Sequence, residues 1–217
     1  MLREVLHNDW LTAFIFLGLV FITIAKYMFT NRFIDFIGVL GNSKYLKIYA
    51  RDQKFIDGFD TLLFLNLVIS ISIFGYVTYQ KLFYPHPFEI IIFLKLLFAV
   101  AAIILIKILL ERLIGSLFDI DKLMDAYLFQ KTSYKNFTGF VLLPINLLLV
   151  YTIAPTEIIC YIVIGIIVAI NLIGFIITLK NHQNIVVNNL FYFILYLCAL
   201  EIGPYLILYK LIIEFKA

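Results

Sequence analysis

Long apolar runs recur along this chain and limit what it can fold into. Six stretches of about twenty residues are built mostly from aliphatic and aromatic side chains, and charged residues make up only 14% of the sequence. Soluble domains carry about 25% charged residues, so an ordinary water-soluble core is excluded. A helix of about twenty apolar residues crosses the roughly 30 Å core of a bilayer. The sequence therefore predicts an all-α, polytopic membrane helical bundle.

The predicted bundle is a single integral membrane domain that covers residues 1–217. Short connections follow the second, fourth and fifth spans, so each of these spans should pack with the next one as a helical hairpin. The predicted spans are at about 9–27, 59–79, 88–110, 137–154, 156–179 and 188–210, and two longer loops occupy 28–58 and 111–136.

Lysine and arginine are divided unequally between the two sides of this predicted bundle. Eleven of them fall on the side of the first, third and fifth loops, and four fall on the other side. Cytoplasmic loops of membrane proteins carry an excess of these residues. We therefore expect the two long loops to be cytoplasmic and both termini to lie outside the cytoplasm.

Both long loops mix apolar with basic residues. In the second loop, Leu123, Met124, Tyr127 and Leu128 follow the i, i+3, i+4 spacing of one helix face. The pattern predicts amphipathic helical segments at the membrane surface. Such segments either seal the cytoplasmic face of the bundle or form a docking platform for a cytoplasmic or membrane partner.

One isolated charge, Glu201, interrupts the last apolar run. Lys95 of the third span falls at the same depth, about 12–14 Å below the outer surface at about 1.5 Å per residue. An unpaired charge in a bilayer costs about 2.5–3.5 kcal/mol on insertion scales, so an intramembrane ion pair is predicted. Gly203 and Pro204 follow Glu201 and predict a helix break, because proline removes a backbone donor.

This predicted site has two interpretations. A structural ion pair would fix two helices against each other. A carboxylate beside a Gly-Pro break is also a way to build an ion or proton site in a membrane. Both interpretations require Lys95 and Glu201 to lie close together.

A second polar layer is predicted nearer the cytoplasmic side. Asn66, Asn146 and Asn171 lie at similar depths in the second, fourth and fifth spans. Hydrogen bonds between such residues stabilise helix association by about 0.6–2 kcal/mol each, so a structural role is expected. Gly165 and Ala169 form a pair of small residues suited to a close helix contact on the fifth span.

The sequence contains no catalytic or metal-binding constellation. His7, His86 and His182 fall in loops or termini without neighbouring ligands, and no P-loop, GxSxG, HExxH or CxxC motif occurs. We therefore predict that the protein is not an enzyme and has no cofactor. The net charge of +3 reflects loop residues and gives no indication of nucleic-acid binding. The expected partners are the lipid bilayer and other membrane proteins, through the cytoplasmic loops or helix faces.

Two segments carry a resemblance to a known family. LYLCALEIGPYLILYK (195–210) and KNFTGFVLLPINLLLVY (135–151) resemble an uncharacterised multi-pass membrane protein family of Bacteroidota, a domain of unknown function. The similarity runs from the second span to the end of the chain. It implies an inner-membrane location in a Gram-negative bacterium, which makes both termini periplasmic. It brings no established activity, and the lineage suggests an accessory role in envelope protein export.

Three functional hypotheses follow. The leading one is a non-enzymatic inner-membrane subunit or accessory protein of a larger envelope complex. The second is a small transporter or proton-coupled membrane protein that uses Glu201 and Lys95. The third, an intramembrane enzyme acting on lipid, is disfavoured by the missing catalytic cluster.

Overall fold

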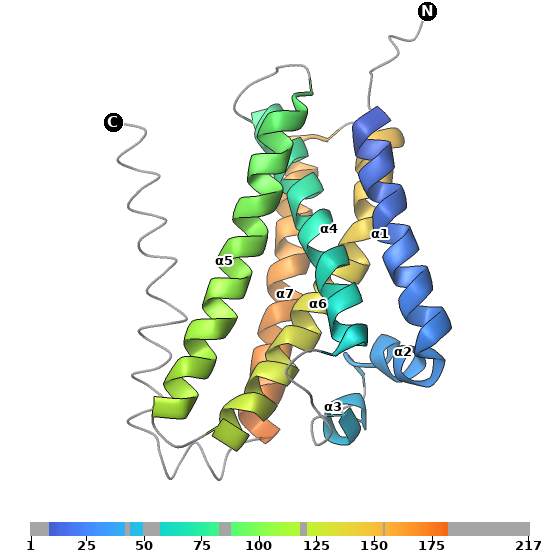
Figure 1. Ribbon diagram of the computed structural model, residues 1–217. Helices are drawn as coiled ribbons and strands as arrows, with labels where there is room; N and C mark the ends of the chain where they lie inside the picture. The colour runs from blue at the N-terminus through green and yellow to red at the C-terminus, as the bar shows by residue number, and fades with distance from the viewer. Residues whose placement is uncertain are drawn as a thin grey trace, which may run out of the picture.

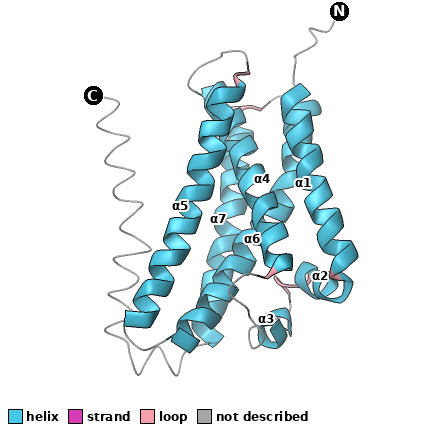
Figure 2. Cartoon of the chain, in the orientation of Figure 1, coloured by secondary structure: helices cyan, strands magenta, loops and turns pink. Residues whose placement is uncertain are grey.

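The computed structural model describes residues 9–41, 44–49, 57–82, 88–117, 121–153 and 155–181. Within these ranges the chain forms helices and no strand, which confirms the predicted all-α bundle (Figure 1, Figure 2). The helices are α1 (Asp9–Met28), α2 (Thr30–Ile37), α3 (Lys44–Tyr49), α4 (Gly58–Leu82), α5 (Ile90–Leu117), α6 (Asp121–Tyr151) and α7 (Glu157–Asn181).

The long helices are apolar enough to make this a membrane protein. Five segments of the described chain have the length and hydropathy to span a bilayer. The sixth predicted span, 188–210, lies outside the described residues. The five segments are Asp9–Met28, Gly58–Gln80, Ile90–Leu117, Met124–Tyr151 and Glu157–Thr178.

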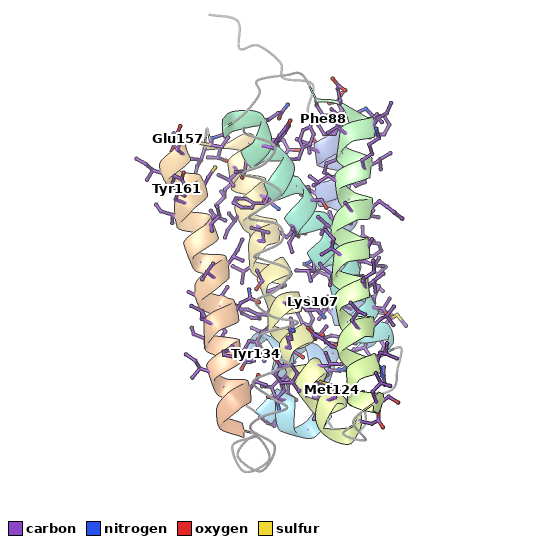
Figure 3. The ribbon with its side chains drawn as sticks, turned by 90° about the vertical axis from the view of Figure 1, so that its left-hand side faces the viewer. Phe88, Lys107, Met124, Tyr134, Glu157 and Tyr161 are labelled. Carbon is purple, nitrogen blue, oxygen red and sulfur yellow. The ribbon has the colours of Figure 1, made fainter. Side chains whose placement is uncertain are left out.

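Helices α4 and α6 form the centre of the bundle. Both begin at the end where α2 and α3 lie, so these two neighbours run parallel, and α1, α5 and α7 run in the opposite direction (Figure 1). α1 packs on both central helices, as does α5, and α7 packs mainly on α6. Figure 3 shows the bundle from the side of α5 and α7, with Phe88 and Glu157 at one end and Met124 and Tyr134 toward the other.

The described helices of the first long loop, α2 and α3, pack against one end of the bundle. In α2, Phe33 and Phe36 point inward and are buried, as are Tyr45 and Leu46 of α3. The ring of Phe36 makes edge contacts with Tyr45 at 5.6 Å and with other rings from α4 and α6. Such edge-to-face pairs add about 0.5–1.5 kcal/mol beyond area burial. α2 and α3 therefore cover the end at which α4 and α6 begin.

The second predicted loop, 111–136, is different from what the sequence pattern indicated. Its first residues continue α5 to Leu117, and α6 begins at Asp121, sixteen residues before the predicted start at 137. The apolar face that contains Met124, Tyr127 and Leu128 is buried inside the bundle and does not form a separate surface helix. The pattern was that of an amphipathic helix, but its apolar face packs against protein.

Close helix contacts occur at glycines. A Cβ on Gly139 of α6 would lie 2.5 Å from Cα of Leu67 in α4, so these backbones touch. Gly174 of α7 similarly faces the Tyr134 ring of α6. At Gly165, no atom of the described residues lies within 4 Å of a Cβ built there, and the predicted sixth span lies outside the described residues, so the contact predicted at Gly165 stays a prediction. Gly165 lies on an exposed side of α7 among the described residues.

Candidate functional site

One arginine and two aspartates fasten α2 to the start of α4. Arg32 donates from Nη1 to Oδ2 of Asp57 and from Nη2 to Oδ2 of Asp60, the latter at 2.9 Å. The exposed fractions of these side chains are 13%, 20% and 18%, so water reaches them poorly. Burial opposes the charge on Arg32, but the charge of Asp60 and the hydrogen bond with Asp57 outweigh it and raise its pKa. Arg32 therefore stays cationic and paired.

Aromatic rings enclose the same guanidinium group. Cζ of Arg32 lies 4.8 Å from the centroid of the Phe59 ring and 5.1 Å from that of Tyr49. Both distances fall within the roughly 6 Å range of cation–π attraction. Asp57 also caps α4, since its Oδ1 accepts a hydrogen bond from the backbone N–H of Phe59 at 3.2 Å. These contacts fix the direction in which α4 leaves the cluster.

A second polar bridge joins α2 to α3. Asp35 accepts hydrogen bonds from Lys44 Nζ at 3.2 Å and from the Tyr49 hydroxyl at 3.4 Å. Tyr45 is fully buried beside this bridge. Its burial, together with the charge of Asp60, raises the pKa of the Tyr45 hydroxyl, which is therefore neutral at physiological pH.

A buried ion pair links α5 to α6. Lys131 Nζ of α6 donates to Oε1 of Glu111 in α5. The Glu111 side chain is 1% exposed and that of Lys131 is 14% exposed. Lys131 Nζ also lies 5.7 Å from the centroid of the Tyr127 ring. Because a buried charge without its partner is strongly destabilising, this pair holds α5 in place against α6.

Sequence reasoning missed both ion-pair clusters. Glu111 and Lys131 fall in a segment that was interpreted as a surface loop. A signal was available there, since no Gly or Pro occurs from 121 to 138 and the fourth span could be extended through Lys131. Arg32 and Asp57 had no comparable signal, because only the fold of the first loop brings them together.

The three asparagines of the predicted polar layer lie on α4, α6 and α7 but do not bond to one another. Asn146 donates from Nδ2 to the backbone carbonyl of Ser70 at 2.8 Å and so joins α6 to α4. Asn171 donates to Oγ1 of Thr138 at 3.2 Å and joins α7 to α6. The side-chain amide of Asn66 bonds to none of the described residues. The layer is therefore a set of separate contacts, because the helices present these side chains to different neighbours.

Several buried polar side-chain atoms, those of Asn66 among them, lack a partner among the described residues. They include both side-chain amide atoms of Asn66 and of Asn136 and the hydroxyl of Ser70, all in residues that are 0% exposed. An unsatisfied buried donor or acceptor costs about 1–3 kcal/mol. The sum would approach the whole stability of a typical domain, about 5–15 kcal/mol. These atoms therefore need partners beyond the described protein groups.

Only one residue of the predicted Lys95–Glu201 pair, Lys95, lies among the described residues. Lys95 lies on α5, and its side chain is exposed on an otherwise apolar stretch of that helix. Glu201, Gly203 and Pro204 lie outside the described residues, so the pairing and the helix break stay predictions.

In the described part of the chain, no group of three or more His, Cys, Asp or Glu side chains could hold a metal ion.

Comparison with known proteins identifies the family. A family model described as "Domain of unknown function (DUF4271)" matches residues 11–212. The chain belongs to the DUF4271 family. No curated protein and no solved structure matches it.

The DUF4271 match is wider than the resemblance seen in the sequence. That resemblance began at the second span, whereas the family match begins within α1. The family match includes both ion-pair clusters, the buried asparagines and Glu201.

Arg32 and Lys131 both form ion pairs with carboxylates of a neighbouring element, so the two clusters are suited to fixing helices in place.

Proposed function

We propose that this DUF4271 protein is a non-enzymatic integral subunit or accessory protein of a larger envelope complex in the bacterial inner membrane. The observation that carries the proposal is the outward side of α2 and α3, which we name the α2–α3 platform. It presents Ile34, Ile37 and Ile48, with exposed fractions of 63%, 47% and 45%. The side chain of Lys44 beside them is 60% exposed.

The platform has the properties of a preformed protein contact. α2 has eight residues, too few to cross a bilayer, and its inner side is already occupied by the aromatic core. Arg32 and Asp35 hold it in position, which reduces the ordering cost that binding has to overcome. An apolar centre with a charged rim is the usual arrangement at protein interfaces.

The proposed membrane and orientation rest on the distribution of Lys and Arg and on the family resemblance. The excess of Lys and Arg on the side of the long loops supports a cytoplasmic position for the platform and periplasmic termini. The resemblance to a family of Bacteroidota supports an inner membrane of that phylum, and envelope protein export is the process that we propose the complex serves.

Gentle-detergent purification of the full chain tests the proposal. We expect a second protein to co-purify in stoichiometric amount, and Ile34→Asp combined with Ile37→Asp to reduce its recovery at least tenfold. Ile153→Asp is the matched control, because Ile153 is 41% exposed in the connection between α6 and α7, at the opposite end of the bundle. Elution of the wild-type chain alone would contradict the proposal.

The exposure of Lys95 favours a second candidate, a small transporter or proton-coupled protein that uses Lys95 and Glu201. A cation on an apolar face of α5 needs a counter-charge, and Glu201 is the predicted one. Glu201→Gln should then abolish uptake or proton coupling in vesicles while the protein remains folded. Unchanged transport with this substitution would exclude the site.

A further inference from the structure

Three helices meet at Asn66 in the interior of the bundle. A Cβ on Gly18 of α1 would lie 3.1 Å from Oδ1 of Asn66 in α4 and 2.5 Å from Cδ1 of Leu143 in α6. The absence of a side chain on Gly18 therefore lets α1 approach both central helices at this point. We call this place the α1–α4–α6 junction.

Two further polar residues lie on the same sides of α4 and α6 as the groups that meet Gly18. Ser70 follows Asn66 by one turn of α4, which puts both on one side of that helix. Asn136 precedes Leu143 by two turns of α6 and so lies on the same stripe as the residue that touches Gly18. All three polar side chains are 0% exposed.

The unpartnered atoms of these residues are a mixture of donors and acceptors. Both Nδ2 and Oδ1 of Asn66 and of Asn136 lack a partner among the described residues, as does Oγ of Ser70. A metal cation would satisfy only the oxygens and would repel the amide hydrogens. An anion would satisfy only the donors. A water molecule both donates and accepts, and buried waters typically make about three hydrogen bonds.

We propose that Asn66, Asn136 and Ser70 form a binding site for internal water at the α1–α4–α6 junction. The site is independent of the proposed role as a complex subunit. It places bound water between segments that are long and apolar enough to span a membrane, on the inner side of the two central helices. Water is needed here because the site brings together side-chain groups whose hydrogen-bonding capacity the described protein leaves unused.

Water-edited solid-state NMR of the full chain in liposomes tests the site. With 15N-labelled asparagine, we expect magnetisation from water to reach Nδ2 of Asn66 and Asn136 at least threefold faster than Nδ2 of Asn171. Asn171 is the matched control, because its amide already donates to Thr138 and to the Ile167 carbonyl. Build-up at Asn66 and Asn136 no faster than at Asn171 would overturn the proposal.

Two variants test whether Asn66 and Asn136 share the bound water, and a coupling measurement tests for a direct hydrogen bond between them. Asn66→Leu should slow the transfer to Asn136 at least threefold, because one partner of the water is lost, whereas Asn171→Leu should leave that transfer unchanged. A scalar coupling across a direct Asn66–Asn136 hydrogen bond in the wild-type protein would overturn the water site. That measurement needs no variant, so a failure of Asn66→Leu to fold does not affect it.

Discussion

Arg32 satisfies two carboxylates and lies against two aromatic rings, so several groups lose a partner when it is removed. Arg32→Ala should lower the free energy of unfolding by about 3 kcal/mol or more, because Asp57 and Asp60 would remain shielded and unpaired. Arg32→Lys should recover only part of this loss, since a lysine cannot form the same planar fork. Thermal unfolding in detergent measures both variants.

Lys26→Ala is the control for Arg32, because Lys26 is an exposed cation in the last turn of α1. It should change the unfolding temperature little. Equal effects of Arg32→Ala and Lys26→Ala would show that the Arg32 cluster does not hold α2 against α4.

The Glu111–Lys131 pair should behave as a coupled unit. Glu111→Leu or Lys131→Met alone leaves one buried charge and should cost about 3–5 kcal/mol, whereas the double substitution should be much less damaging. A double-mutant cycle by denaturant unfolding measures the coupling. The Arg112–Asp125 pair of the same two helices is the control, because its side chains are 36% and 42% exposed and its coupling should stay below about 1 kcal/mol. Additive effects at Glu111 and Lys131 would contradict the pairing.

At the scale of elements, the long helices were predictable and their extents were only partly so. Apolar runs of about twenty residues indicate spanning helices, because a bilayer leaves few other structures possible. The pattern does not show where a helix continues beyond the apolar run, and α6 begins with a polar half whose Gln130, Ser133 and Asn136 are buried. α6 packs against α4, α7, α5 and α1, and a local pattern does not contain the contacts with the distant helices α1 and α4.

The contact between α4 and α6 gives a prediction about glycine. Gly139→Ala would force a Cβ against the backbone of Leu67 and should lower stability by about 1–3 kcal/mol. Gly165→Ala meets no atom of the described residues within 4 Å and should be neutral or stabilise by up to about 1 kcal/mol, since alanine favours a helix. Chemical denaturation of the two variants measures the contrast. Equal stabilities would mean that α4 and α6 are farther apart than described.

At the scale of the whole molecule, the orientation in the membrane is testable with one cysteine at each end. In a background without Cys160 and Cys198, a membrane-impermeant maleimide added to spheroplasts should label Ile153→Cys and leave Ile34→Cys unlabelled. The reason is the excess of Lys and Arg on the side of the long loops. Lysed membranes, in which both should react, are the control. The reverse labelling pattern would overturn the proposed orientation.

The predicted Lys95–Glu201 pair joins two segments that are far apart in the chain. Lys95→Glu and Glu201→Lys should each destabilise the protein, and the exchange of both residues should restore most of the lost stability if the two charges are paired. Unfolding temperatures in detergent measure this. Lys26→Glu in place of Lys95→Glu serves as the control that Glu201→Lys should not rescue. If Lys95→Glu does not restore the stability of Glu201→Lys, the predicted ion pair between Lys95 and Glu201 is wrong.

The ion-pair clusters show why the candidate site was harder to predict than the fold. Glu111 and Lys131 lie on consecutive helices, and a longer helix assignment would have placed them near each other. Arg32 and Asp60 depend on how a connecting segment folds back on the bundle, and single-sequence patterns do not encode such contacts. The Asn66 site is harder still, because a buried asparagine is recognised as unpartnered only when its neighbours are known.

The parallel arrangement of α4 and α6 has a consequence for how the protein is made. Neighbouring parallel helices cannot form a hairpin, so α5 must first return the chain to the end where α6 starts (Figure 1). During synthesis, α4 therefore enters the membrane before its largest partner, and only α1 and α5 can cover it until α6 is inserted. A chain that stops after α5 would lack the contact of Gly139 with Leu67 and the hydrogen bond from Asn146 to the Ser70 carbonyl, so the side of α4 that faces α6 would be left to lipid.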